Sequence, residues 1–281
     1  MGSPNGVEAA LSADWLGAAR RAGDAARATL ARYPGPTERA RETGRGDGGD
    51  MTLAIDRAVE DTVLDELAAV GVGVDAVSEE RGRLPLAGGG RALVVVDPID
   101  GSLNAKRRLR PFSLSIAVAR GETMRDVEFG YVADLASDDE WWARRGEGAF
   151  FGGDPLALPP DPELEILGVE SARPELVAAA GGALAATGAR RLRMIGSIAV
   201  SLCHVAAGRF DALVSLRPAR SVDAAAGQLL VREAGGVVAF PDTADGGLGA
   251  SLTLSMRSRV VAAPSPGALE QLGALAVPVP G

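Results

Sequence analysis

The chain has 281 residues, of which 47% are hydrophobic and 23% are charged, and its formal net charge at pH 7 is −8. This composition is that of a globular protein with room for one large domain or two moderate ones. The acidic balance argues against nucleic acid as a partner, because surfaces that bind nucleic acid are basic. The single cysteine, Cys203, excludes an intramolecular disulfide, and the apolar run around it predicts that it is buried.

The sequence shows no pattern typical of a secretory signal or of a membrane-spanning helix. Residues Met1 to Ala10 lack a basic segment followed by an apolar one, which a secretory signal requires. The stretch from Leu176 to Thr187 is apolar but too short and too rich in glycine to span a bilayer. We therefore expect a cytoplasmic protein without a membrane partner.

The first half of the chain begins with helical patterns and continues with strands. Apolar residues at helical spacing predict helices over 11–33 and 53–70. Residues 37–49 between them are polar and rich in glycine, so we expect a mobile loop. Such a loop could close over a bound anion, with Arg41 or Arg45 approaching it, unless it is only a disordered surface loop. Runs of apolar and β-branched residues predict strands at about 91–97, 113–119, 126–133 and around Trp141-Trp142.

A cluster of four prolines between Asp154 and Pro162 predicts a link between two halves. We expect an N-terminal α+β half over 1–158 and a C-terminal α/β half over 159–281. In the second half, predicted strands and helices alternate, and this alternation is typical of α/β layers. The strands are expected at 165–169, 191–195, 211–216 and 260–263, and the helices at 174–187, 197–207 and 223–234.

Carboxylates gather around the end of one predicted strand. The β-branched run Val94-Val95-Val96 is stopped by Pro98 and Gly101, which places Asp97 and Asp100 on the turn that follows it. Further carboxylates stand upstream and downstream, at Asp56, Glu79, Glu80 and Asp223. Magnesium prefers carboxylate and carbonyl oxygens and shares the phosphates of its substrates. These positions therefore predict a magnesium site, unless the aspartates are only turn formers.

Four segments carry a family resemblance, and they follow one another in a set order. They are Glu79-Glu80, DPIDGS at 97–102, GSIAV at 196–200 and VDAAAGQLLVREAGG at 222–236. From about Asp50 to Gly236 the chain resembles the inositol monophosphatase and fructose-1,6-bisphosphatase superfamily, in its bacterial or archaeal type. The resemblance implies an α/β (α+β) fold, a layered αβαβα sandwich with the active site between its two halves.

The resemblance also implies how the carboxylates share the metals. Glu79, Asp97 and the carbonyl of Ile99 would hold a first Mg²⁺, and Asp97, Asp100 and Asp223 would hold a second. A weaker third ion would lie near Glu79, and Mn²⁺ could replace Mg²⁺. Asp97 would bridge two ions, so that both act on one phosphate. Asp223 could instead serve only as the cap of the helix that follows it.

Ser102 and Asp56 are the expected partners of the attacking water. By resemblance, the hydroxyl at position 102, usually a threonine, orients a water activated by the metal, and Asp56 holds the hydroxyl. We therefore assign catalytic roles to Ser102, Asp56 and Glu79. One alternative is that Ser102 is a covalent nucleophile. Its weakness is that the only histidine, His204, stands in an apolar helix where packing with satisfied polar atoms is expected. Asp56 could also lie on the solvent face of its helix.

The substrate contacts are expected from glycines, serines and arginines. The amides of Gly101 and Ser102 are candidates for the phosphate, and Gly196 and Ser197 match the family segment that contacts substrate hydroxyls. Gly196 could equally be a plain turn. The basic run Lys106-Arg107-Arg108-Leu109-Arg110 follows the aspartates closely. We expect at least one cation of this run at the rim, with Arg107 and Arg108 favoured, and Arg217 and Arg220 could approach the same rim. They would bind a second anionic group, unless the run is only a solvated basic loop.

The resemblance implies a Mg²⁺-dependent phosphomonoesterase that acts on inositol monophosphate or a similar sugar or polyol phosphate. Val222 replaces the tryptophan of the animal enzymes, and the preceding segment lacks a glutamate that contacts inositol there. Both features resemble the archaeal enzymes that also hydrolyse fructose bisphosphate. The alternatives are therefore a fructose-1,6-bisphosphatase or dual enzyme, a phosphatase of 3′-phosphoadenosine 5′-phosphate, and an inactive metal-binding scaffold. The only macromolecular partner that the resemblance implies is a second copy of the chain, in a homodimer.

Overall fold

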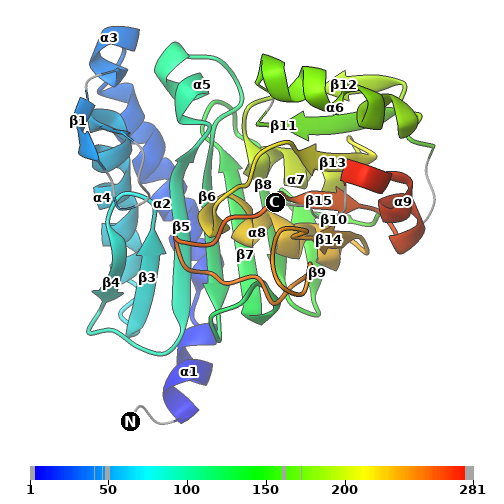
Figure 1. The fold of residues 1–281 in the computed structure, drawn as a ribbon. Helices are drawn as coiled ribbons and strands as arrows, with labels where there is room; N and C mark the ends of the chain where they lie inside the picture. The colour runs from blue at the N-terminus through cyan, green and yellow to red at the C-terminus, as the bar shows by residue number, and fades with distance from the viewer. Residues whose placement is uncertain are drawn as a thin grey trace.

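The structure is a computed structural model that describes residues 4–40, 42–45, 47, 51–159, 163–171 and 173–275. Within these ranges, no helix is long and apolar enough to cross a membrane. The described chain forms five layers, in which helices and two β-sheets alternate (Figure 1). The expected αβαβα sandwich is therefore confirmed.

The larger sheet has eight strands and is built by the first half of the chain. Its pairs are antiparallel except for β3 and β5, which run parallel. From one edge to the other its strands are β10 (Asp154–Leu156), β9 (Gly148–Phe151), β8 (Glu140–Arg144), β7 (Val127–Asp134), β6 (Ser113–Ala119), β5 (Leu93–Asp100), β3 (Val74–Ser78) and β4 (Gly82–Leu86). Every residue of β5 and β6 is buried, because helices cover both faces of the sheet there.

The smaller sheet has five strands from the second half of the chain. Its first three strands are parallel, and the last two pair antiparallel. In spatial order they are β12 (Arg191–Arg193), β11 (Ile166–Glu170), β13 (Ala212–Ser215), β15 (Val261–Ala263) and β14 (Val237–Ala239). The strand β12 is an edge strand whose three residues are exposed.

Three apolar cores hold the layers together. The outer face of the larger sheet packs against α1 (Pro4–Leu11), α2 (Trp15–Ala31) and α4 (Ala54–Ala68). The helices α7 (Ile198–Ala206) and α8 (Ser221–Glu233) fill the space between the two sheets. The far face of the smaller sheet packs against α6 (Pro174–Ala186) and α9 (Pro266–Gln271). Cys203 is fully buried in the middle core, as predicted.

Several expected boundaries shift for local reasons. The first long helix begins at Trp15 instead of residue 11, because the side chain of Asp14 caps it by accepting a hydrogen bond from the amide of Gly17 at 2.9 Å. The sequence pattern also missed the short strands β3 and β4 and the one-and-a-half-turn helix α5 (Ser102–Arg107). Of these, β3 and α5 border the candidate site, because Glu79 follows β3 and Ser102 and Lys106 belong to α5.

The expected loop over 37–49 is described only in part. It contains the helix α3 (Pro36–Arg39) and the strand β1 (Glu42–Arg45), which pairs with β2 (Met51–Leu53). The described part is therefore regular structure rather than irregular loop. Arg41 and residues 46 and 48–50 lie outside the described residues, as does the side chain of Arg45.

Candidate active site

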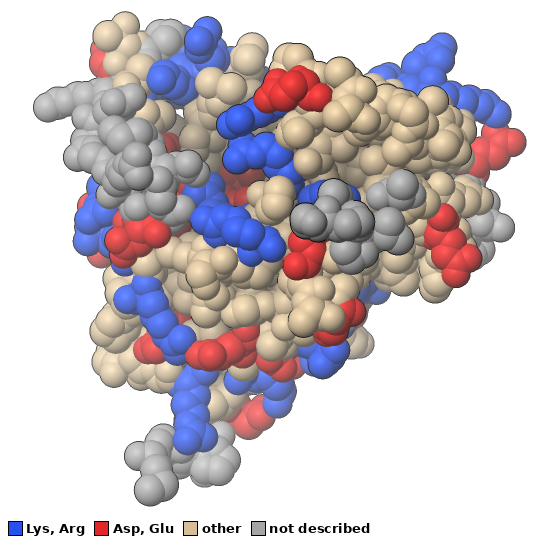
Figure 2. Space-filling model, viewed as in Figure 1, with Lys and Arg blue, Asp and Glu red and all other residues tan. Residues whose placement is uncertain are grey.

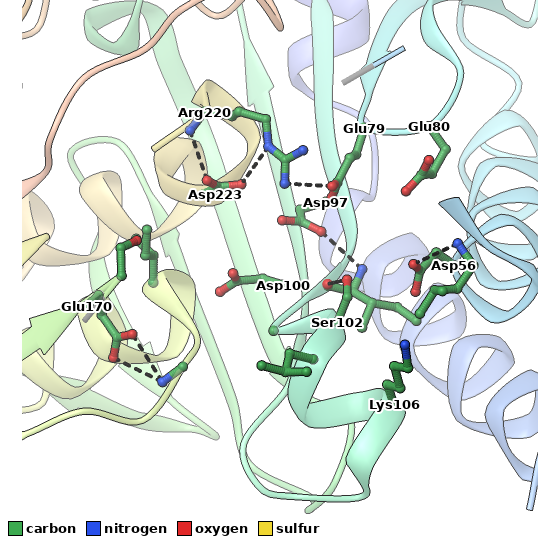
Figure 3. A pocket seen from close by; sticks show the side chains of 17 residues that line it. Asp56, Glu79, Glu80, Asp97, Asp100, Ser102, Lys106, Glu170, Arg220 and Asp223 are labelled. Carbon is green, nitrogen blue, oxygen red and sulfur yellow. Dashed lines mark hydrogen bonds and ion pairs between the residues drawn. The ribbon is translucent and has the colours of Figure 1, made fainter. Parts of the chain in front are cut away.

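A cavity of about 470 Å³ opens where the carboxyl ends of β3, β5 and β11 meet the first turns of α5 and α8. Nine of the predicted site residues line it (Figure 3). They are Asp56, Glu79, Asp97, Ile99, Asp100, Gly101, Ser102, Gly196 and Asp223. The fold therefore brings together residues that are up to 167 positions apart in the sequence, as the difference between 56 and 223 shows.

Glu79 is held in the cavity by a buried carboxylate beneath it. It belongs to the turn that follows β3, and Glu60 of α4 lies under this turn with no exposed surface. One oxygen of Glu60 accepts hydrogen bonds from the Ser78 hydroxyl and from the amides of Glu80 (3.1 Å) and Arg81 (3.2 Å). The helix α4 thus fixes the turn that carries Glu79, and the sequence pattern gave no sign of this role.

Asp97 and Asp100 both line the cavity because β5 is irregular between them. Residues three apart on a regular strand point to opposite faces of the sheet. The pairing of β5 with β6 shifts register between these two aspartates, so both carboxylates reach the same space. Oδ1 of Asp97 also accepts a hydrogen bond from the amide of Ile99 at 3.1 Å, which holds the bend.

Asp100 is anchored by the second half of the chain. Its Oδ2 accepts hydrogen bonds from the Ser197 hydroxyl at 2.5 Å and from the amide of Ala199 at 2.7 Å. Ser197 is the N-cap of α7, so the carboxylate lies against the positive end of that helix. The cavity therefore depends on the docking of α7 against β5.

Asp223 lies in the first turn of α8, where it faces the cavity and is largely buried. Its Oδ2 accepts a hydrogen bond from the backbone amide of Arg220 at 2.9 Å, so it caps its own helix. The Arg220 guanidinium then reaches across the cavity, 2.6 Å from Oε1 of Glu79 and 3.6 Å from Oδ1 of Asp223. Figure 3 shows it between these two carboxylates.

Ser102 and Asp56 line the same cavity but are not hydrogen-bonded to each other in this structure. The Ser102 hydroxyl donates to the carbonyl of Ile99 at 3.0 Å. Asp56 is buried and accepts a long hydrogen bond from the amide of Leu53 at 3.4 Å, while its Oδ1 has no partner in the described part of the chain. The alternative that Asp56 lies on the solvent face of its helix is therefore wrong.

Gly101 and Gly196 let two loops approach each other at the cavity floor. Both have positive φ angles, 93° and 83°. A Cβ atom on Gly101 would lie 2.9 Å from the carbonyl of Gly196, and one on Gly196 would lie 2.9 Å from the Asn104 amide nitrogen. Asn104 ties the loops by donating to the carbonyl of Ile195 at 2.7 Å. Gly196 is thus both a turn and part of the cavity wall.

The carboxylates raise one another's pKa values. Burial, assisted by repulsion from Asp223, raises the pKa of Glu79 to about 8, despite the opposing effect of Arg220. Burial and the charges of Glu79 and Asp100 raise the pKa of Asp97 well above its usual range. Burial and the charge of Asp223 raise the pKa of Asp100 to about 7. A cation in their midst would relieve this repulsion.

The donor set suits a hard divalent cation. Every candidate ligand offers a carboxylate or carbonyl oxygen, and burial together with neighbouring negative charges disfavours the ionised form of Glu79, Asp97 and Asp100. As the side chains stand, however, no group of three or more Asp, Glu, His or Cys in the described ranges is arranged to hold a metal ion. The Arg220 guanidinium lies between two of the expected ligands. The chemistry of the donors therefore fits Mg²⁺, with a side-chain rearrangement.

Three of the predicted arginines lie outside the cavity wall, whereas Arg220 lines it. Arg107, Arg108 and Arg217 are exposed and do not line the cavity. The cations that do line it are Lys106, at the end of α5, and Arg220. The helix α5 explains the difference, because its register turns Lys106 inward and leaves the next two side chains in solvent. Ser197 is also buried behind the wall, where Asp100 engages its hydroxyl.

Glu170 is a site residue that sequence reasoning missed. It ends β11, is 2% exposed and lines the cavity. Its carboxylate accepts hydrogen bonds from the amides of Ile195 and Gly196 at 3.1 Å each and from the Ser201 hydroxyl at 2.7 Å. Its place at the carboxyl end of a predicted parallel strand was the signal that could have found it, because ligands bind there in α/β sheets.

Known proteins resemble this chain along most of its length. The model of the inositol monophosphatase family matches residues 12–278. A fructose-1,6-bisphosphatase/inositol-1-monophosphatase of Methanothermobacter thermautotrophicus is 31% identical over 89% of this chain and 91% of its own. One of the same name from Archaeoglobus fulgidus is 34% identical over 72% of this chain and 75% of its own.

Among solved structures, an inositol monophosphatase–fructose 1,6-bisphosphatase superposes with a TM-score of 0.80. It is 24% identical, and the alignment covers 93% of this chain and 99% of that one. This likeness extends through both sheets, because it covers nearly the whole of each chain.

Proposed function

Because the chain belongs to the inositol monophosphatase family and is a metal-dependent phosphatase, we propose that it hydrolyses inositol monophosphate or a similar sugar or polyol phosphate with Mg²⁺ as cofactor. The observation that supports this most is the meeting of Glu79, Asp97, Asp100 and Asp223 in one cavity, where burial and neighbouring negative charges raise the pKa values of the first three. Buried carboxylates with no catalytic or metal-binding role are expensive to keep together.

The residues that would hold Mg²⁺ fall into two overlapping sets. Glu79, Asp97 and the carbonyl of Ile99 would hold one ion, and Asp97, Asp100 and Asp223 a second, with a third near Glu79. Bound Mg²⁺ would supply an acidified water and neutralise charge on the leaving oxygen. Two or three ions, and Mn²⁺ in their place, belong to the same proposal.

The protein itself would orient the water and the phosphate. Because the Ser102 hydroxyl donates a hydrogen bond to the Ile99 carbonyl, its oxygen lone pairs can accept a hydrogen bond from water in the cavity. Oδ1 of Asp56 has no partner in the described part of the chain, so it can accept a second hydrogen bond from the same water. The amides of Gly101 and Ser102 would bind phosphate oxygens. Glu170 holds the Gly196 loop that would face the rest of the substrate.

A fructose-1,6-bisphosphatase or dual activity is the second candidate. The wall carries two cations, Lys106 and Arg220, beyond the expected metals, and a bisphosphate would use both. Figure 2 shows blue side chains around a hollow with red in its depth, which is the pattern expected for a site that binds anions above metal ligands. The relatives in two archaea carry both activities in their names.

A substrate screen with Mg²⁺ tests these assignments. It should compare inositol 1-phosphate, fructose 1,6-bisphosphate and 3′-phosphoadenosine 5′-phosphate with a generic phosphate ester. We expect turnover of the first or second substrate that EDTA abolishes. Preference for the adenosine substrate would replace the proposed substrate class. No turnover of any ester at saturating Mg²⁺ would favour the inactive scaffold.

A homodimer in the cytoplasm completes the proposal. The exposed apolar side chains of Leu103 and Leu109 on one side and Leu192 and Met194 on the other support a contact surface. Asn104 joins these two segments through the carbonyl of Ile195, so the four side chains belong to neighbouring stretches. Sedimentation of the wild type and of a Leu109→Asp variant would test the dimer.

A further inference from the structure

Arg220 forms an ion pair within the group of expected metal ligands. Its Nη2 lies 2.6 Å from Oε1 of Glu79, and its Nε lies 3.6 Å from Oδ1 of Asp223. The three side chains are 17%, 10% and 12% exposed, so water screens these contacts poorly. The attraction between these charges is therefore screened less than that of an ion pair at the surface.

The charges of the cavity wall show why a guanidinium lies there. Seven carboxylates line the cavity, and Lys106 and Arg220 are the lining cations. Lys106 acts on Asp56, whereas Arg220 lowers the pKa values of both Glu79 and Asp97 against the effect of burial. Arg220 is thus the cation that compensates the carboxylates expected to bind metal.

A divalent cation and this guanidinium cannot share the same carboxylate oxygens. Two cations on Oε1 of Glu79 would repel each other, and the side chains of Arg220 and Glu79 are only 17% and 10% exposed. The arginine side chain is long and unbranched, so it can turn away while its backbone amide keeps the 2.9 Å hydrogen bond to Oδ2 of Asp223. Oδ1 of Asp223 would then be available to a metal.

We propose that Arg220 competes with the catalytic metal for Glu79 and Asp223. In the metal-free enzyme the guanidinium neutralises these carboxylates and keeps the site folded. Metal binding displaces it, and repulsion from the metal turns it toward the substrate, where it binds an anionic group. This inference rests on the proposed metal site, and it adds a cost to metal binding that the ligands alone do not predict.

If Arg220 supported the metal ligands instead of competing with the metal, its removal would change the Mg²⁺ affinity in the opposite direction. If Arg220 only held Glu79 and Asp223 in place for the metal, its removal would loosen the ligands and weaken Mg²⁺ binding. If it competes, its removal strengthens Mg²⁺ binding and destabilises the metal-free protein. The sign of the change in affinity therefore separates the two roles without an activity assay.

The experiment compares Arg220→Met with the wild type by calorimetric titration of Mg²⁺ and by thermal melting in EDTA. Arg217→Met is the matched control, because it removes an exposed arginine three residues away that does not line the cavity. We expect Arg220→Met to bind Mg²⁺ at least about tenfold more tightly, since a charge-assisted bond no longer opposes the metal. Its melting temperature in EDTA should fall, and its gain in melting temperature on adding Mg²⁺ should exceed that of the wild type.

Arg220→Lys keeps the test decisive if the methionine variant does not fold without metal. Lysine retains one charge but lacks the planar fork that spans two carboxylates, so its Mg²⁺ affinity should lie between those of wild type and methionine. Unchanged or weaker Mg²⁺ binding by either variant would overturn the competition. Absence of Mg²⁺ binding by the wild type would instead overturn the proposed metal site, and the competition with it.

Binding of inorganic phosphate at saturating Mg²⁺ tests the second step. The wild type should bind phosphate at least about fivefold more tightly than Arg220→Met, because the displaced guanidinium provides a charge-assisted contact. Arg217→Met should match the wild type. Equal phosphate binding by all three proteins would contradict the proposal that the displaced Arg220 side chain binds an anionic group of the substrate.

Discussion

The Ser197 hydroxyl lies 2.5 Å from Oδ2 of Asp100. This buried hydrogen bond joins the first half of the chain, which builds the larger sheet, to the second half, which builds the smaller one. Ser197 begins α7, which packs between the sheets, whereas Asp100 ends β5 of the larger sheet. The orientation of a candidate metal ligand is therefore set by a residue 97 positions away in the sequence. Partners behind the ligands usually matter for metal affinity almost as much as the ligands themselves.

Ser197→Ala should weaken the site without dismantling it. The change removes the hydrogen bond that the Ser197 hydroxyl donates to Asp100 and the N-cap hydrogen bond that it accepts from the amide of Val200. We expect a stability loss of about 1 kcal/mol, and a loss of roughly 10- to 100-fold in Mg²⁺ affinity or turnover. Ser113→Ala is the control, because that buried hydroxyl lies 3.3 Å from Ser197. Wild-type turnover in Ser197→Ala would show that Asp100 does not need this support.

Asp97→Asn should abolish turnover and stabilise the metal-free protein. Burial and neighbouring charges hold the pKa of Asp97 above its usual range, so its ionised form destabilises the folded state at neutral pH. The neutral amide removes that repulsion, and the melting temperature in EDTA should rise. Retention of more than a few per cent of turnover at saturating Mg²⁺ would contradict the bridging role.

Ser102→Ala and Asp56→Asn should each reduce turnover by roughly 10²- to 10⁴-fold, the usual scale for positioned acid–base groups. If both orient one water, the double variant should be little worse than either single one. Steady-state kinetics of the four proteins would complete the cycle. Additive losses would mean that the two residues act separately, as their different hydrogen-bond partners in this structure allow. A trapped phosphoserine at Ser102 would instead establish covalent catalysis.

Lys106→Met should raise the KM for fructose 1,6-bisphosphate at least about tenfold and change that for inositol 1-phosphate little, if the second phosphate uses this lysine. The sequence pattern favoured Arg107 and Arg108 for this role, but both are exposed and neither lines the cavity. The double variant Arg107→Met/Arg108→Met is therefore the matched control. A larger effect in the arginine variant would return the role to the exposed run.

The stability of the protein should depend on pH through His204. The imidazole packs perpendicular to Trp141, and its Nδ1 has no hydrogen-bond partner in the described part of the chain, contrary to the expectation of a satisfied histidine. Burial lowers its pKa from 6.5 to about 4. Protonation therefore favours the unfolded state, so this contribution is complete above about pH 6.5 and is lost as the pH falls toward 4.

Denaturant unfolding of wild type and His204→Phe in EDTA at pH 7 and pH 4.5 would measure this contribution. Wild type should lose up to about 3 kcal/mol more than the variant, since one pKa unit corresponds to about 1.4 kcal/mol. Titration of the carboxylates cancels in the comparison. Equal losses in both proteins would show that the imidazole is hydrated in the folded state.

Much of the fold could be predicted because long elements carry strong periodicity. The helices around Ala22, Val63 and Leu229 and the strands around Val95 and Ile116 lie within a few residues of their expected positions. Short elements such as β3, β4 and α5 lack enough residues for a pattern, so they were missed. Missing α5 affected the site prediction, because this helix determines which basic side chain lines the cavity.

The site residues that belong to recognisable sequence motifs could be predicted. Asp97, Asp100 and Asp223 stand in recognisable segments, and all three line the cavity. Glu60 and Glu170 could not be found in this way, because each acts on backbone amides that become neighbours only in the folded chain. The place of Arg220 shortly before Asp223 suggested that it could approach the rim, but its position between Glu79 and Asp223 depends on the side-chain conformation.

The place of Asp223 has a consequence for how the protein is made. Residues 79, 97 and 100 leave the ribosome more than a hundred positions before residue 223, since 223 minus 100 is 123. Synthesis is slow enough for the first half to begin to fold while α8 is still absent. The nascent larger sheet then lacks the helix that covers its inner face and the arginine that compensates Glu79. If Asp223 completes the proposed ligand set, metal binding would be among the last steps of folding, and a chain truncated before α8 should neither retain Mg²⁺ nor escape aggregation.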